Sequence, residues 1–147
     1  MGYGNLQQPP PIPNNGPACW DLVIADVENG LACEESSDFA GWDRVHDLVL
    51  AEMRERHALG KAKYEGVYLQ PANGRDALAD WYQEALDGAV YARQAVHEYD
   101  ARDMRIPGAN HDLVRVRQAC QKQLALVFTI REMIADRDEA RAAKSDT

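Results

Sequence analysis

Apolar residues recur at helical spacing over most of the chain, whereas no segment alternates apolar and polar residues as a half-buried strand does. The spacing predicts three long helices, over about 43–63, 73–100 and 110–141. Pro107 and Gly108 break the pattern between the last two segments. The expected fold class is therefore all-α.

Each expected helix carries an apolar stripe that should be buried. The stripes are Val45, Leu48, Val49 and Leu59 in the first helix, Leu78, Trp81, Ala85, Ala89 and Val96 in the second, and Leu113, Val116, Cys120, Leu124, Val127, Ile130 and Ile134 in the third. The third helix has further apolar residues on other faces, namely Val114, Phe128 and Met133. Since three long helices do not close a symmetric bundle by themselves, we expect helices to pair between subunits, in a homodimer or homotetramer.

The N-terminal segment differs in composition from the rest of the chain. Residues 1–18 contain five of the seven prolines, so they lack backbone donors and are expected to form an extended arm. Residues 19–147 are expected to form a single all-α domain. A short apolar run at 20–28 is echoed at 46–54, which either two similar helix starts or a duplication would explain.

Charge and cysteine content restrict the partners and the compartment. The chain has 24 acidic and 16 basic residues and a net charge of −8, which argues against binding to nucleic acid or to an anionic membrane. No apolar stretch is long enough to span a membrane, and the first residues do not resemble a signal peptide. Three cysteines without CxxC spacing favour a reducing compartment, so the expected location is cytoplasmic.

Carboxylates occupy helix faces where they would be costly. Continuing the apolar stripe of the first helix by steps of three and four residues leads to Glu52 and Glu55. In the second helix one line of residues consists of Asp80, Glu84, Asp87, Tyr91 and Glu98. An ionised carboxylate removed from water must be paired or must coordinate a metal, and carboxylate pairs on two facing helices would suit a hard divalent cation. For either pair alone, a solvated face is the alternative.

These residues resemble a known family. The pattern Glu52-x-x-Glu55, 28 intervening residues and Glu84-x-x-Asp87 resembles the ExxE…ExxD signature of MazG-like all-α nucleoside triphosphate pyrophosphohydrolases. Neighbouring blocks similar to small phage-encoded members are Lys63-Tyr64, Leu69-Gln70-Pro71, Asn73-Gly74-Arg75-Asp76 and Tyr82-Gln83-Glu84-Ala85-Leu86-Asp87. The resemblance covers about residues 46–100. One departure is Glu65-Gly66 after Lys63-Tyr64, where the family has glycine directly, which suggests a one-residue insertion.

The resemblance implies a helical bundle of the MazG-like type, completed by helix packing between subunits. It implies hydrolysis of a (deoxy)nucleoside triphosphate to the monophosphate and pyrophosphate, with dGTP or GTP as the preferred substrate. Two or three Mg²⁺ or Mn²⁺ ions would be held by Glu52, Glu55, Glu84 and Asp87, with Asp80 as a fifth ligand or as an acceptor beside the ligands. Glu52 or Glu55 would be the general base. A phage-encoded chain would act in the host cytoplasm.

A triphosphate also requires cations and contacts from the protein. Lys61, Lys63 and Arg75 lie around the loop between the two acidic helices. Asn73 is expected to cap the second helix, with Asp76 three residues on, and Arg75 with the free amides of the first turn would then bind an anion. The candidate substrate-binding residues are Lys61, Lys63, Tyr64, Asn73, Arg75, Trp81 and Tyr91. Tyr64, Trp81 and Trp42 could stack on a base, although aromatic residues more often belong to a core or its boundary.

Two other functions remain open. The first is a non-catalytic helical assembly or adaptor protein, in which the acidic faces are solvated and the third helix drives association. The second is an HD-type phosphohydrolase, suggested by the dipeptides His46-Asp47 and His111-Asp112. The complete H…HD…D set of that chemistry is not found, and Asp112 at a helix start is favoured by the helix dipole without any metal.

Overall fold

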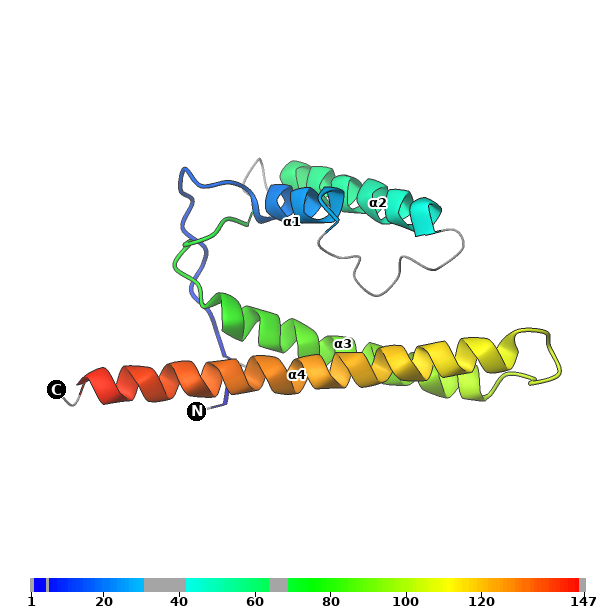
Figure 1. Cartoon of the computed structure of the whole chain (residues 1–147). Coiled ribbons are helices and arrows are strands. Elements are labelled where there is room, and N and C mark those ends of the chain that lie inside the picture. The colour runs from blue at the N-terminus through cyan, green and yellow to red at the C-terminus, as the bar shows by residue number, and fades with distance from the viewer. Residues whose placement is uncertain (1, 5, 31–41, 64–68, 146–147) are drawn as a thin grey trace. The chain divides into compact units, whose positions relative to one another are not determined.

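The computed structural model describes residues 2–4, 6–30, 42–63 and 69–145. Over these residues its regular secondary structure consists of helices, without a strand, which confirms the expected all-α class. The four helices are α1 (Cys19–Glu28), α2 (Trp42–Lys63), α3 (Ala77–Asp100) and α4 (Ala109–Ser145), shown in Figure 1. None of the described helices is long and apolar enough to cross a membrane.

The long helices match their expected segments closely, and the clearest difference is the start of α3. Asp76, rather than Asn73, is the N-cap: its backbone is extended and its side chain accepts a hydrogen bond from the amide of Ala79 at 3.2 Å. The Asn73 side chain instead accepts from the amide of Arg75 at 3.0 Å. The prediction of an Asn73 cap was therefore wrong, because both residues can cap and only Asp76 lies directly before the helix.

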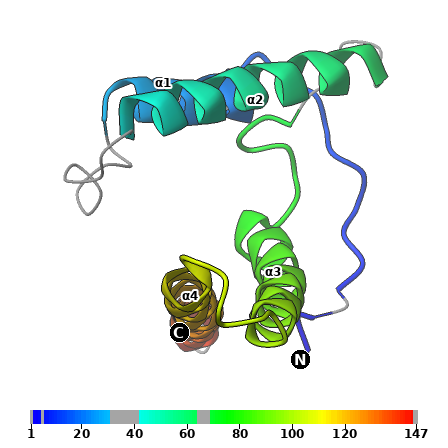
Figure 2. The same ribbon diagram turned by 90° about the vertical axis from the view of Figure 1, so that its right-hand side faces the viewer.

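The chain divides into two compact units. One consists of residues 9–75 and contains α1 and α2, which pack against each other. The other consists of residues 1–8 and 76–147 and contains the antiparallel pair of α3 and α4, seen nearly end-on in Figure 2. The expected boundary after residue 18 coincides with neither division, and a single domain over 19–147 stays a prediction.

The core of the α3–α4 unit lies where the two helices face each other. Ile130 and Ile134 are completely buried and cluster with Ala85. Leu113 and Cys120 are buried on the same stripe of α4, as expected. Leu124, by contrast, is 45% exposed, and so the prediction of its burial was wrong. The described part of α4 packs against one helix, and such a pair covers only a narrow stripe.

A polar residue takes part in the α3–α4 contact. The amide of Gln123 donates to the carbonyl of Ala85 at 2.9 Å. Gly88 makes room for it, since a Cβ at this position would lie 2.7 Å from Nε2 of Gln123. Trp81, expected on the apolar side of α3, is 46% exposed. Helical spacing alone therefore did not identify which side chains face α4.

In the described structure, the face of α2 that is buried differs from the expected one. Val45, Leu48, Val49 and Leu59 are exposed to between 37% and 62%, whereas Leu50 and His57 are buried. Polar contacts to α1 explain this rotation of the helix. They are His46 Nε2 to the carbonyl oxygen of Val27 at 3.1 Å, His57 Nδ1 to an oxygen of Asp21 at 3.5 Å, and an ion pair between Arg54 and Glu28. The expected stripe is left uncovered.

The first residues of the chain pack on α3 and α4. The Tyr3 ring lies against the cluster of Ala85, Ile130 and Ile134, and its hydroxyl donates to Asp138 at 2.6 Å. The Gln83 amide donates to the carbonyls of Tyr3 and Leu6, both at 3.0 Å. This N-terminal segment is thus a third layer of the α3–α4 unit.

Candidate functional site

The first carboxylate pair lies on the uncovered face of α2. Glu52 and Glu55 are three residues apart and both exposed. At 100° per residue they share this face with Val45, Leu48 and Leu59, which are also exposed. The solvated face of an amphipathic helix carries mainly polar side chains. The α2 face therefore combines a carboxylate pair with apolar side chains that lack a cover in the described residues.

The second pair lies on α3 in a similar setting. Glu84 and Asp87 are exposed and three residues apart, and Asp80, one turn before Glu84, is half-buried. Two exposed aromatic residues accompany the pair: Tyr91, on the same line, is 70% exposed, and Trp81 is 46% exposed. Side-chain oxygens in this arrangement are the ligands that Mg²⁺ and Mn²⁺ prefer. The donor chemistry of each pair thus fits a hard divalent cation.

The two pairs belong to different units. Glu52 and Glu55 are part of the 9–75 unit, and Glu84 and Asp87 are part of the unit that contains α3 and α4. Among the described residues, no three acidic, His or Cys side chains form a group that could hold a metal ion. A site that unites the four carboxylates therefore stays a prediction.

Two predicted phosphate-binding residues lie at the end of α2. Lys61 and Lys63 are exposed in its last turn. A cation at this position also stabilises the helix through its dipole, so helix stability alone would explain them. Tyr64 lies outside the described residues.

The loop between the acidic helices holds two further candidates. Asn73 is buried at 6% exposure, and its carbonyl oxygen accepts from the amide of Ile12 at 2.7 Å. Arg75 is half-buried, and its Nη1 donates to the carbonyl of Pro9 at 3.0 Å. Gly74 between them has a φ of +83°, which only glycine adopts without strain. The hydrogen bonds of Asn73 therefore help to fix the conformation of the loop, while the Arg75 side chain is held by its bond to Pro9.

Asp76 replaces the expected anion site at the start of α3. Its carboxylate accepts from Arg137 at 2.7 Å as well as from the Ala79 amide. Burial works to raise the pKa of this carboxyl, but the hydrogen bonds from Arg137 and Ala79 outweigh it and hold the pKa below its usual value. The first turn of α3 thus donates to a carboxylate of the chain itself, through the Ala79 amide. The prediction that the amides of this turn are free to bind a substrate anion was wrong.

Several residues that organise this region carry no signal in the local sequence pattern. Gln70 is buried at 8% exposure and bonds to the backbone of residues 14 and 16. Arg137 bridges Asp76 and Asp138, which lie on either side of the α3–α4 contact. The partners of Gln70, and Asp76 as a partner of Arg137, lie more than fifty residues away in the sequence, at a spacing that helical periodicity does not reveal.

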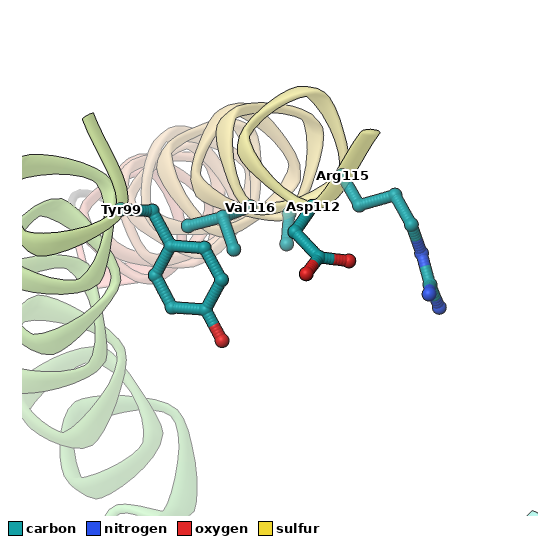
Figure 3. Close-up of a pocket in the computed structure, with 5 residues that line it drawn as sticks. Tyr99, Asp112, Arg115 and Val116 are labelled. Atoms are coloured by element: carbon teal, nitrogen blue, oxygen red, sulfur yellow. The ribbon is translucent and has the colours of Figure 1, made fainter. Parts of the chain in front are cut away.

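The structure also has a shallow pocket of about 350 Å³ at the other end of the α3–α4 pair. Its lining residues are Tyr99 from α3 and Asp112, Arg115, Val116 and Ala119 from α4. Figure 3 shows the Tyr99 hydroxyl and the Asp112 carboxylate on the same open side of the helices. The guanidinium carbon of Arg102 lies over the Tyr99 ring, 3.5 Å from its centre. None of the predicted site residues lines this pocket.

The two His-Asp dipeptides belong to different units. His46 lies against the α1 carbonyl of Val27, in the 9–75 unit. His111 is exposed at the start of α4, in the other unit. Asp112 lies in the first turn of α4, where the helix dipole favours a carboxylate.

No protein-family model, no curated protein and no solved structure matches the chain.

Proposed function

We propose that the chain is a divalent-cation-dependent nucleoside triphosphate pyrophosphohydrolase of the MazG-like kind. The observation that carries this proposal is the pair of i,i+3 carboxylates on each of two helices. Glu52 and Glu55 on α2, and Glu84 and Asp87 on α3, are all exposed. Each pair lies among exposed apolar or aromatic side chains, which supports a buried or shared site rather than a solvated face.

In this proposal the four carboxylates and Asp80 hold two or three Mg²⁺ or Mn²⁺ ions. Ions held there would neutralise the charge of the triphosphate and make an attacking water more acidic. Glu52 or Glu55 takes a proton from that water as general base. Water adds across the bond between the α- and β-phosphates, which breaks, and the products are the nucleoside monophosphate and pyrophosphate.

The substrate is bound by residues around the loop between α2 and α3. Arg75 and the lysines at the end of α2 would contact phosphate oxygens, with Arg75 suited to a bidentate contact. Trp81 and Tyr91 are exposed beside the second carboxylate pair and would stack on the base. The preference for dGTP or GTP rests on the resemblance to phage-encoded members.

The test is turnover of the eight common ribo- and deoxyribonucleoside triphosphates with Mg²⁺ or Mn²⁺, with monophosphate and pyrophosphate separated by chromatography. Glu84→Gln removes one ligand charge from an exposed position, so it should lower kcat/KM by at least about 100-fold and leave the helical circular dichroism unchanged. Glu98→Gln is the matched control. It makes the same change on the same line of α3, at a carboxylate that accepts from Gln94, and should retain activity.

Retained activity in Glu84→Gln would contradict the metal assignment. Absence of turnover with every nucleotide would contradict the enzyme and favour the adaptor function. The adaptor also predicts a melting temperature that does not respond to divalent cations. In the enzyme, metal with nucleotide raises the melting temperature by mass action, and the shift across the panel ranks the bases.

A further inference from the structure

The proline-rich arm lies along the loop that presents Arg75, and backbone contacts join the two segments (Figure 1). The amide of Ile12 donates to the carbonyl of Asn73 at 2.7 Å. Beyond the arm, the amide of Cys19 donates to the carbonyl of Leu69 at 2.8 Å. Both segments belong to the 9–75 unit, so this is an internal feature of that unit.

The composition of the arm suits this contact. Four of the six residues from 9 to 14 are prolines, which have no N–H and a fixed φ. The two backbone donors that remain in this stretch are those of Ile12 and Asn14. Ile12 donates to Asn73, and Asn14 donates to the side chain of Gln70 at 3.0 Å. The stiff stretch 9–14 thus directs both of its backbone donors to the loop, and it loses little conformational entropy in doing so.

Gln70 is the anchor on the loop side. Its amide is buried at 8% exposure, and it donates to the carbonyls of Asn14 at 2.7 Å and Gly16 at 2.6 Å while its oxygen accepts from Asn14. A buried amide is costly unless it is hydrogen-bonded. Every one of these bonds ends on the backbone of the arm, so the loop requires the arm for its buried glutamine.

The same loop fixes Arg75 at two points. Its amide donates to the side chain of buried Asn73, and its guanidinium donates to the carbonyl of Pro9 in the arm. The arm also passes close to Gly74: a Cβ at this position would lie 3.2 Å from Cδ1 of Ile12. The backbone and the side chain of Arg75 therefore both depend on the position of the arm.

We infer that the arm is part of the substrate site, in which residues 9–14 hold Arg75 ready for the polyphosphate chain and Gln70 and Asn73 are its positioning residues. The role toward polyphosphate rests on the proposed function. Preorganisation of this kind lowers the ordering cost of binding, so its loss should weaken substrate binding rather than slow the chemical step.

The most selective variant is Ile12→Pro. It joins the prolines at 9–11 to Pro13 in one continuous run and removes the N–H that bonds to Asn73, whereas Ile12→Ala keeps that N–H and truncates only the side chain. We expect Ile12→Pro to raise KM for the nucleoside triphosphate about tenfold with kcat within twofold, and Ile12→Ala to raise KM much less. Equal KM values for wild type and Ile12→Pro would overturn the inference.

A double-mutant cycle asks whether Gln70 acts through Arg75. Gln70→Ala should raise KM at least tenfold in the wild-type chain, but no more than twofold in a chain that already carries Arg75→Ala. A merely structural role predicts the same factor in both backgrounds, and that outcome would overturn the inference. Amide hydrogen exchange of Ile12 gives an independent readout. It should be protected in wild type and fast in Gln70→Ala, and fast exchange in wild type would contradict the arm–loop contact.

Calorimetric titration with inorganic tripolyphosphate and Mg²⁺ separates this inference from the proposed function. Binding by wild type that is at least tenfold weaker in both Gln70→Ala and Arg75→Ala supports the inference even if no nucleotide is hydrolysed. Binding that both variants retain, or no binding by wild type, overturns it. Turnover of nucleotides with unchanged KM in these variants would agree with the proposed enzyme activity but contradict the role of the arm.

Discussion

Asp76 shows how one residue can change its expected role. The sequence suggested that it supports a cap at Asn73, but the structure makes it the cap itself and pairs it with Arg137 across the α3–α4 contact. Arg137 also contacts Asp138, which in turn accepts from the Tyr3 hydroxyl. Four side chains from three distant segments thus form one network at the start of α3.

This network predicts a pH-dependent stability. The pKa of Asp76 is lower in the folded protein than in the unfolded chain, so its contribution is complete above the unfolded value of about 3.9 and is lost as the pH falls through the folded value. Asp76→Asn keeps an oxygen for the cap but loses the charge opposite Arg137. At pH 7 it should lower the melting temperature by roughly 5 °C, the shift that about 1 kcal/mol produces in a small domain.

The difference between Asp76→Asn and wild type should shrink as the pH falls below about 4, because the wild-type carboxyl then becomes neutral. Asp103→Asn is the control. Its partner Arg105 is 91% exposed, so the melting temperature should not change measurably at any pH. A constant difference between Asp76→Asn and wild type from pH 7 to pH 2.5 would contradict the charged pair.

At the scale of elements, the N-terminal segment 2–8 belongs to the α3–α4 unit as much as the helices do. Tyr3 packs on the core cluster, and the guanidinium carbons of Arg131 and Arg137 lie 5.7 and 5.9 Å from its ring centre. Gln8 fastens the end of the segment, since its side chain bonds to both the amide and the carbonyl of Asp76. The segment was expected to be part of an arm and instead covers one side of the helix pair.

Two substitutions at Tyr3 separate its polar and its apolar contributions. Tyr3→Phe removes only the hydroxyl that bonds to Asp138, whereas Tyr3→Ala also removes the ring from the core. Thermal unfolding should show a decrease in melting temperature for Tyr3→Phe of a few degrees, and one at least twice as large for Tyr3→Ala. Wild-type melting in Tyr3→Ala would show that the segment does not stabilise the helix pair in solution.

At the scale of the whole molecule, large apolar side chains are exposed in both units. On α4 these are Val114 at 44%, Leu124 at 45% and Phe128 at 76%, in addition to the uncovered face of α2. A pair of helices covers only one stripe of each, so further faces need another partner. This supports the predicted pairing of helices between subunits, in a homodimer or homotetramer.

Association between copies should depend on salt. Each copy carries a net charge of −8, so added salt screens the repulsion and should strengthen self-association, which analytical ultracentrifugation between 20 and 300 mM NaCl would measure. Phe128→Glu should weaken association at least tenfold without loss of helicity, since the side chain contributes little to its own unit. Ile106→Glu, at a 57% exposed position in the turn before α4, is the matched control. A monomer at every salt concentration would contradict the prediction.

The sequence by itself determined the three long helices, whereas α1 was not among the predicted elements. Helical spacing predicted α2, α3 and α4 nearly to their ends, because a helix is stabilised by contacts between residues three and four apart. The same local rule places Glu52 with Glu55, and Glu84 with Asp87, on one face of their helices. The proline content also predicted that the N-terminal segment is not helical, since proline lacks the amide that a helix requires.

Only the tertiary structure decided which face each helix buries and what the N-terminal residues do. Polar contacts to α1 bury Leu50 and His57 of α2 in place of the expected stripe. Gln70 bonds to the arm across 56 residues of sequence, Arg137 to Asp76 across 61, and Tyr3 to Asp138 across 135. Periodicity reports on neighbours along one helix, whereas burial and hydrogen bonding are settled between segments that meet only after the chain has folded.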